Sequence, residues 1–213
     1  MKKATLWVTI LTISSLLIAN VPINISIQKL IKIEKKYGPK AKQRVLLWDR
    51  MLEQAKGKNT LEKLKIVNDF FNKVQYKRDS VHWKIKDYWA SPFEFLGTGA
   101  GDCEDYAIAK YFALRQLGIE DSKLKITYVK LSRSGTKYEE AHMVLNYYHK
   151  PNQPPVVLDN INKRLMLATK RTDLKPVYSF NAVGLWKAQN KGKEEVNMGS
   201  NNLKNWKLMM ERI

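Results

Sequence analysis

The spacing of apolar residues changes at Gly118, and this change constrains the fold more than any other feature of the chain. Before Gly118, apolar residues recur every three or four positions, which is typical of one face of a helix. After it, short runs alternate between apolar and polar residues, which is typical of strands. The sequence therefore predicts an α+β fold, with helices in its first half and a sheet in its second.

Helical stripes predict the elements that precede this change. One stripe covers residues 41–55, and Gly38-Pro39 separates it from another helical piece. A second helix is expected to begin with Thr60 as its N-cap and to carry apolar residues as far as position 74. A third helix runs through residues 103–117 and is stopped by the glycine that follows.

The remaining segments give weaker signals. Residues 76–101 have no sustained period, and we expect a long, aromatic-rich loop there. The polar stretch 189–202 is expected to be a linker, followed by a closing amphipathic helix over 203–213. The predicted strands are residues 123–131, 141–149, 155–159 and 176–181.

The N-terminus has the pattern of an export signal. Met1-Lys2-Lys3 precedes an apolar stretch of about 15 residues, shorter than the roughly 20 that a spanning helix needs. The small-residue cleavage pattern is poor, so an uncleaved membrane anchor stays open as an alternative. We therefore expect residues 1–22 to be a signal peptide or anchor and 23–213 to form a single domain.

The chain is strongly basic. It carries 38 Lys and Arg against 20 Asp and Glu, a formal net charge of +18, which favours anionic partners in general. The lysines are spread along the chain, without an Arg-rich block or the aromatic pattern of RNA-binding sheets. We therefore expect a solvated basic surface and no nucleic-acid partner.

The only cysteine, Cys103, lies in the stretch GAGDCEDYA among three carboxylates. A single cysteine cannot form an internal disulfide, so it is either a small buried apolar residue or a free thiol. Asp102 is expected to be the helix N-cap, with Asp105 reaching back to it. A helix N-terminus favours a thiolate and can hold an oxyanion, whereas the nearby acids oppose ionisation.

Two later residues could complete a cysteine nucleophile. His142 lies on a predicted strand and could act as the base, and Asp159, at the end of another, could orient the ring. The chain order is then Cys, His, Asp. The alternatives from the residues alone are a structural histidine and an aspartate that belongs to a turn.

Several segments together resemble the LapG family of bacterial transglutaminase-like cysteine proteinases. They include GDCEDYAIAKYF (101–112), LKITYVK (124–130), AHMVLNYY (141–148) and VVLDNIN (156–162). The resemblance implies a papain/transglutaminase-like fold, in which the nucleophile helix packs on a small antiparallel sheet. It also implies a triad of Cys103, His142 and Asp159.

The resemblance further implies a calcium ion beside the nucleophile, held by Asp102 and Glu104, with Asp105 as a further candidate ligand. Clustered carboxylates suit calcium, which takes six to eight oxygen ligands, and a dication would reverse the local charge around the thiol. The alternative from the residues alone is a helix N-terminus with acids in its first turn.

The function implied by the resemblance is a calcium-dependent periplasmic protease. Its substrate would be the N-terminal region of a large RTX-type surface adhesin, whose release promotes biofilm dispersal. Its regulator would be an inner-membrane cyclic-di-GMP receptor resembling LapD, which sequesters it. The alternatives are a transglutaminase, in which an amine resolves the acyl-enzyme, and a non-enzymatic calcium-binding or membrane-surface adaptor.

Overall fold

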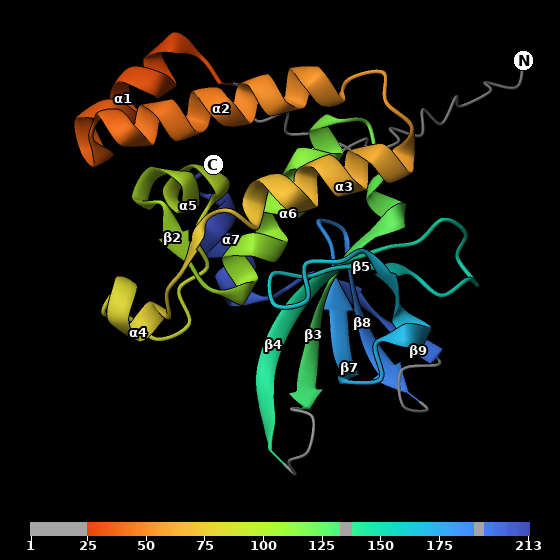
Figure 1. Cartoon of the computed structure of the whole chain (residues 1–213). Helices are drawn as coiled ribbons and strands as arrows, with labels where there is room; N and C mark the ends of the chain where they lie inside the picture. Colours follow the sequence, from red (N-terminus) through yellow and green to blue (C-terminus); the bar gives the residue numbers. More distant parts are fainter. Residues whose placement is uncertain (1–24, 133–137, 190–193) are drawn as a thin grey trace, which may run out of the picture.

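The computed structural model describes residues 25–132, 138–189 and 194–213, and the predicted signal segment lies outside this part of the chain. Helices gather on one side of an antiparallel sheet (Figure 1). In the described ranges, none of the helices has the length and apolar character that crossing a bilayer requires. The helices are α1 (Ile27–Tyr37), α2 (Pro39–Ala55), α3 (Thr60–Phe71), α4 (Asp79–His82), α5 (Pro92–Thr98), α6 (Cys103–Gln116) and α7 (Lys204–Met210).

The main sheet has the strand order β6-β5-β4-β3-β7-β8-β9, and every neighbouring pair is antiparallel. Its strands are β3 (Leu124–Ser132), β4 (Glu139–Tyr147), β5 (Val156–Leu158), β6 (Met166–Leu167), β7 (Leu174–Phe180), β8 (Gly184–Gln189) and β9 (Glu194–Ser200). Two further short strands, β1 (Gln75–Tyr76) and β2 (Ala100–Gly101), pair in parallel apart from it. The predicted α+β fold with an antiparallel sheet is confirmed.

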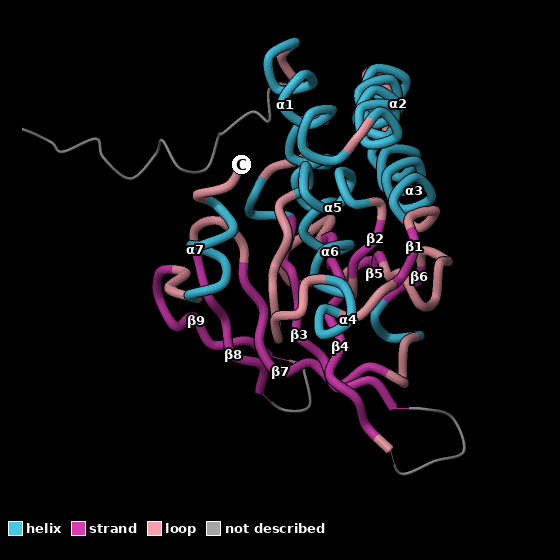
Figure 2. The backbone as a smooth tube through the Cα atoms, turned by 90° about the vertical axis from the view of Figure 1, so that its left-hand side faces the viewer, coloured by secondary structure: helices cyan, strands magenta, loops and turns pink. Residues whose placement is uncertain are grey.

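Helix α6 forms the centre of the molecule because it packs on the sheet with one face and on other helices with the rest. It contacts β3 and β4 on one side and α3 and α5 on another, and Figure 2 shows it between the helical layer and the strands. Its residues from Glu104 to Leu114 are all buried. The N-terminus of this helix is therefore held rigidly against the middle of the sheet.

Three expectations from the sequence were wrong. The second helix is capped by Asn59 rather than Thr60: the Asn59 side chain accepts a hydrogen bond from the Glu62 backbone at 3.0 Å, while Glu62 bonds back to Asn59. Residues 76–101 are not one loop, because they contain α4 and α5. The predicted polar linker contains the whole of β9, an edge strand whose residues are largely exposed and so lack an apolar alternation.

Candidate active site and metal site

Cys103 is the first residue of α6, and the backbone that leads into it passes close to neighbouring side chains. A side chain added to Gly101 would lie 2.7 Å from the ring of Phe95, so this approach requires glycine. Asp102 is the N-cap, and Asp105 Oδ2 accepts a hydrogen bond from the Asp102 backbone N–H at 3.2 Å. The predicted capping arrangement is confirmed, and it places the thiol at the positive end of a helix.

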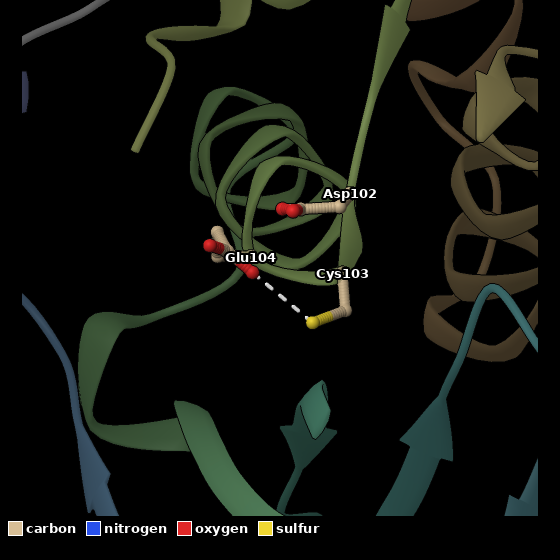
Figure 3. Close-up of side chains that lie close together, drawn as sticks. All are labelled: Asp102, Cys103 and Glu104. Carbon is tan, nitrogen blue, oxygen red and sulfur yellow. Dashed lines mark hydrogen bonds between the residues drawn. The ribbon is translucent and has the colours of Figure 1, made fainter. Parts of the chain in front are cut away.

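The hydrogen bond of the Cys103 thiol goes to a neighbouring carboxylate. The sulfur donates to Glu104 Oε2 at 3.0 Å, as Figure 3 shows. Burial, followed by the charge of Glu104 and this hydrogen bond, raises the pKa of the thiol well above its ordinary value. A hydrogen bond with the Met143 backbone acts in the opposite direction but does not outweigh them. These effects favour the protonated form of the thiol.

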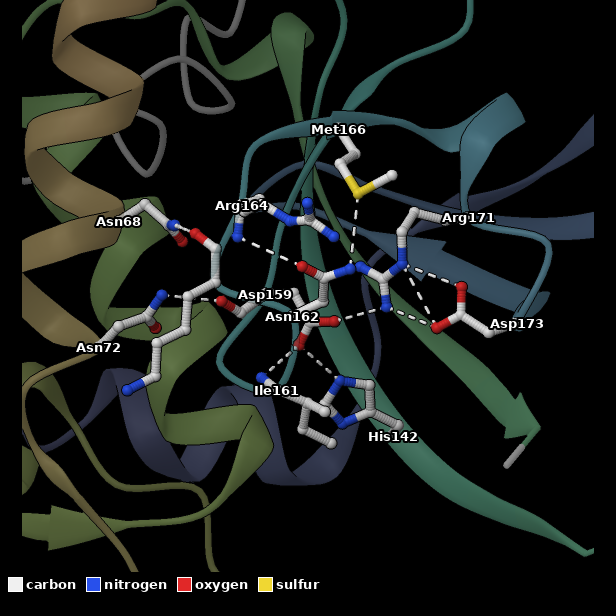
Figure 4. A network of polar contacts seen from close by, with 11 residues as sticks. Asn68, Asn72, His142, Asp159, Ile161, Asn162, Arg164, Met166, Arg171 and Asp173 are labelled. Atoms are coloured by element: carbon white, nitrogen blue, oxygen red, sulfur yellow. Dashed lines mark hydrogen bonds and ion pairs between the residues drawn. The ribbon is translucent and has the colours of Figure 1, made fainter. Parts of the chain in front are cut away.

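His142 and Asp159 form a buried pair. His142 Nε2 lies 2.8 Å from Asp159 Oδ1, and both side chains are almost completely excluded from solvent. The same oxygen accepts a hydrogen bond from the Ile161 backbone N–H at 2.9 Å, and Arg171 Nη2 donates to Oδ2 at 2.8 Å. Figure 4 shows Asp159 between His142 and Arg171.

These contacts fix the charge of Asp159 and the tautomer of His142. Burial alone would raise the pKa of the Asp159 carboxyl, but His142, the Ile161 N–H and Arg171 together hold it well below its ordinary value. An ionised carboxylate only accepts hydrogen bonds, so Nε2 of His142 must carry the proton. The other ring nitrogen, Nδ1, is then left as an acceptor for a proton.

The structure brings two of the three predicted triad residues into hydrogen-bond contact. The third, Cys103, lies beside the same strand, since its sulfur bonds to the backbone of Met143, the residue after His142. Among the described residues, the side-chain partner of the thiol is Glu104 and not the imidazole. Transfer of the thiol proton to His142 therefore stays a prediction.

Sequence reasoning missed Arg171, which stands in a turn before β7 and is 2% exposed. Besides Asp159 it binds Asp173, with Nη2 at 2.8 Å from Asp173 Oδ2. Its charge and spacing alone do not separate this arginine from the other basic residues. Only the folded chain brings it to the carboxylate.

Four carboxylates crowd the start of α6. Oxygens of Asp79, Asp102 and Asp105 lie within 4.8 Å of one another, and a second group of that size joins Asp102 and Glu104 with the Cys103 sulfur. Asp79 was also missed, because it lies 23 residues before Asp102, in the segment that was expected to be a loop. Oδ1 of Asp79 and Oδ1 of Asp102 are buried without a hydrogen-bond partner.

The pKa values show that the crowding is unfavourable without a cation. Burial, followed by the charge of Asp102, raises the pKa of Asp79 to about 7. The same two causes raise the pKa of Glu104 well above its usual value, and burial raises that of Asp102. Unpartnered oxygens and raised pKa values are what a divalent cation would correct, so this donor set fits one.

Asp105 differs from the other three acids. Its Oδ1 accepts from the Ala90 backbone N–H at 2.8 Å and its Oδ2 from the Asp102 N–H. Both oxygens thus hold backbone in place, and a ligand role for Asp105 stays a prediction.

We expect Asp79→Asn to stabilise the metal-free protein at alkaline pH. The Asp79 carboxyl has a pKa of about 7 in the folded protein, against 3.8 in the unfolded chain. Its contribution to the free energy of unfolding is therefore most favourable at low pH and is lost as the pH rises to about 7. At pH 8 the variant should gain up to about 4 kcal/mol in free energy of unfolding, and near pH 4 almost nothing. Denaturant titrations in chelator at both pH values measure this, and a pH-independent gain would contradict it.

The chain is similar to a family of cysteine proteinases and to solved structures of one of its members. Residues 41–187 match the family model described as bacterial transglutaminase-like cysteine proteinase. Among solved structures, calcium-bound LapG of Legionella pneumophila is 39% identical, covering 88% of this chain and 99% of that one with a TM-score of 0.74. The EGTA-treated form of the same protein is 38% identical, covering 88% and 97%, with a TM-score of 0.76. No curated protein matches the chain.

Proposed function

The chain belongs to the bacterial transglutaminase-like cysteine proteinase family, and on this premise we propose that it is a calcium-dependent cysteine endopeptidase. Cys103 is the nucleophile, His142 the base, and Asp159 the carboxylate that orients the ring. The observation that carries the proposal is the buried 2.8 Å bond between His142 and Asp159, next to the strand position that contacts the Cys103 sulfur.

The chemistry follows from the tautomer of His142. With Nε2–H donated to Asp159, Nδ1 accepts the proton of the Cys103 thiol. The thiolate attacks the scissile carbonyl carbon, and the backbone N–H of Cys103 helps to hold the oxyanion at the helix N-terminus. The imidazolium then gives its proton to the leaving amine, and water hydrolyses the thioester.

Calcium belongs to the proposal because the acids at the start of α6 need a cation. Asp102 and Glu104 would hold it, and the structure adds Asp79, whose Oδ1 is buried and unpartnered. The calcium-bound structure of LapG from Legionella pneumophila supports this choice of ion. When bound, the dication supplies positive charge that offsets the carboxylates and lowers the pKa of the thiol.

The substrate proposed is the N-terminal region of a large RTX-type surface adhesin, cut in the periplasm so that the adhesin is released and the biofilm disperses. The proposed regulator is an inner-membrane cyclic-di-GMP receptor of the LapD type, which sequesters the protease. Both rest on the family. The net charge of +18 suits acidic surfaces on either protein.

The test is incubation of the calcium-loaded protein with a purified adhesin N-terminal fragment, followed by mass spectrometry. Two fragments whose masses add up to the substrate plus one water are expected. A cross-linked product would instead identify an acyl transferase, and an unchanged substrate would refute an adhesin protease.

We expect Arg171→Met to lower kcat by about tenfold or more, which is about 1.4 kcal/mol in the barrier. The change removes a charged donor from the buried Asp159 carboxylate, whose hold on the His142 ring then weakens. Peptide cleavage and thermal unfolding are measured together.

The matched control for this change is Asp173→Asn, which alters the outer partner of the same guanidinium and leaves the inner contact intact. It should retain most of the activity. Equal activity of Arg171→Met and wild type would show that Asp159 does not depend on Arg171.

A further inference from the structure

The loop between α4 and α5, residues 83–91, lies against the acids at the start of α6. The Tyr88 backbone N–H donates to Asp79 Oδ2, and the Ala90 backbone N–H donates to Asp105 Oδ1 at 2.8 Å. The backbone of this loop therefore helps to fix the position of two of the four carboxylates.

The same loop has a backbone conformation that needs support from outside. Lys84 and Asp87 both have a φ of 59°, in the left-handed region that residues other than glycine rarely adopt. Both side chains are exposed, so burial does not hold them in place. A backbone of this kind persists when contacts with the rest of the protein fix it. The loop therefore depends on contacts from another element.

These contacts come from the C-terminal helix α7 and the residues that follow it. Asn205 Nδ2, on α7, donates to Asp87 Oδ2 at 2.7 Å and to the Asp87 backbone oxygen at 3.1 Å. Arg212 Nη2 donates to the Trp89 backbone oxygen at 2.6 Å, and its guanidinium carbon lies 4.6 Å from the centre of the Tyr88 ring. The loop is therefore held on both sides of Tyr88.

Helix α7 is a rigid support because its apolar face belongs to the core. The Trp206 ring is buried and stacks on that of Phe112, on α6, with 5.8 Å between the ring centres. It also meets the Phe180 ring edge-on at 5.5 Å. Figure 1 shows the C-terminus beside α5, where Arg212 Nε binds Glu94 Oε2 at 3.2 Å. The end of the chain therefore connects the core to the loop.

We propose that residues 204–213 form a C-terminal clasp for the calcium site, with Asn205 and Arg212 as its positioning residues. This inference rests on the proposed function, in which Asp79 helps to hold the ion. By fixing the loop, the clasp keeps the Tyr88 N–H on Oδ2 of Asp79 and leaves Oδ1 for the cation. Oxygen ligands that are oriented before the ion arrives bind it more tightly.

The test is calcium titration calorimetry on the full chain with Asn205→Ala, Arg212→Met and Lys207→Met. The first two changes remove donors to the loop, whereas Lys207 is an exposed residue of the same helix that donates to Asn202 and is the matched control. We expect each of the first two to raise the Kd for calcium about tenfold, and Lys207→Met to stay within about twofold of wild type.

The calcium dependence of cleavage separates positioning from a general loss of stability. At limiting calcium, Asn205→Ala and Arg212→Met should cleave the adhesin fragment more slowly than wild type, and excess calcium should restore the rate. A merely structural role would instead lower the unfolding temperature in chelator and leave the Kd unchanged, and that result would overturn the clasp.

A further readout needs neither calcium nor substrate. Hydrogen exchange at the backbone amides of Tyr88 and Ala90, measured in chelator, reports directly on the two bonds from the loop to the acids. Exchange should accelerate severalfold in Asn205→Ala and Arg212→Met but not in Lys207→Met.

Calcium binding with the wild-type Kd in both variants, or unchanged exchange at Tyr88, would overturn this inference. If Arg212→Met unfolds because the buried Glu94 carboxylate loses its partner, Asn205→Ala decides alone, since it loses only two bonds at the surface. A wild-type chain that binds no calcium would instead refute the proposed function, while amide exchange would still test the hold on the loop.

Discussion

Replacing Cys103 by alanine is expected to reduce adhesin cleavage below detection, by at least about 10³-fold. The chain has no other cysteine, so no second thiol can take over the attack. Because the residue is half-buried at a helix start and its backbone, rather than its side chain, begins α6, alanine should leave the fold intact. Cleavage rate and thermal unfolding, measured on the same samples, check both parts.

The control for this prediction uses the same single thiol. Alkylation by iodoacetamide can modify only Cys103 and should abolish activity in step with the mass increase of one adduct per chain. His142→Ala should remove activity and also slow alkylation, because the imidazole is the group that takes the thiol proton. Cleavage at the wild-type rate by the alanine variant would exclude the thiol mechanism.

The sequence predicted the parts of the fold that have long, regular patterns. Helices α2 and α6 and strands β3 and β4 each have nine residues or more, which is long enough for a period to show, and each appears close to its expected place. Helices α4 and α5 have four and seven residues, too few for a period to show. Helix α5 is capped by Ser91 at its start and by Gly99 at its end, whereas α4 has no side-chain cap, and both depend on packing against neighbouring elements.

The site was predicted to the extent that its residues lie in local motifs. The stretch around Cys103 and the strand positions of His142 and Asp159 could be identified along the chain, and the structure joins the last two. Arg171 and Asp79 could not be found, because each reaches its partner only through folding of segments that are remote or irregular. Both residues act through their charge, and charged residues are common along this chain and follow no helical or strand period that would mark these two.

Removal of calcium is expected to abolish cleavage while the protein stays folded. Without the ion, Glu104 accepts the hydrogen bond of the Cys103 thiol, and burial together with the charges of Glu104 and Asp102 holds the pKa of the thiol well above its usual value. The proton then stays on sulfur at neutral pH, and no nucleophile forms. Cleavage measured in EGTA and after return of calcium or magnesium tests this, and calcium alone should restore the rate, because magnesium demands a smaller octahedral shell.

Asp102→Asn should also reduce cleavage, because it weakens the binding of calcium. The change removes the charge of Asp102, which belongs to both clusters of possible metal ligands at the start of α6. Its Oδ1 atom has no hydrogen-bond partner. Calcium titration calorimetry should give at least a tenfold weaker Kd, which is about 1.4 kcal/mol. Glu120→Gln, which changes an exposed acid outside the cluster, is the matched control and should bind calcium as wild type does.

Reactivity of the thiol connects the two predictions without any substrate. Alkylation of Cys103 requires the thiolate, so its rate against pH reports the pKa of the sulfur directly. Calcium should move the midpoint of that curve to lower pH in wild type, because the ion offsets the negative charge of Asp102 and Glu104 that now raises it. In Asp102→Asn the same calcium concentration should leave the midpoint almost unmoved. If calcium does not shift this midpoint in wild type, or if cleavage is undiminished in metal-free buffer, the acids at the start of α6 serve only to cap the helix.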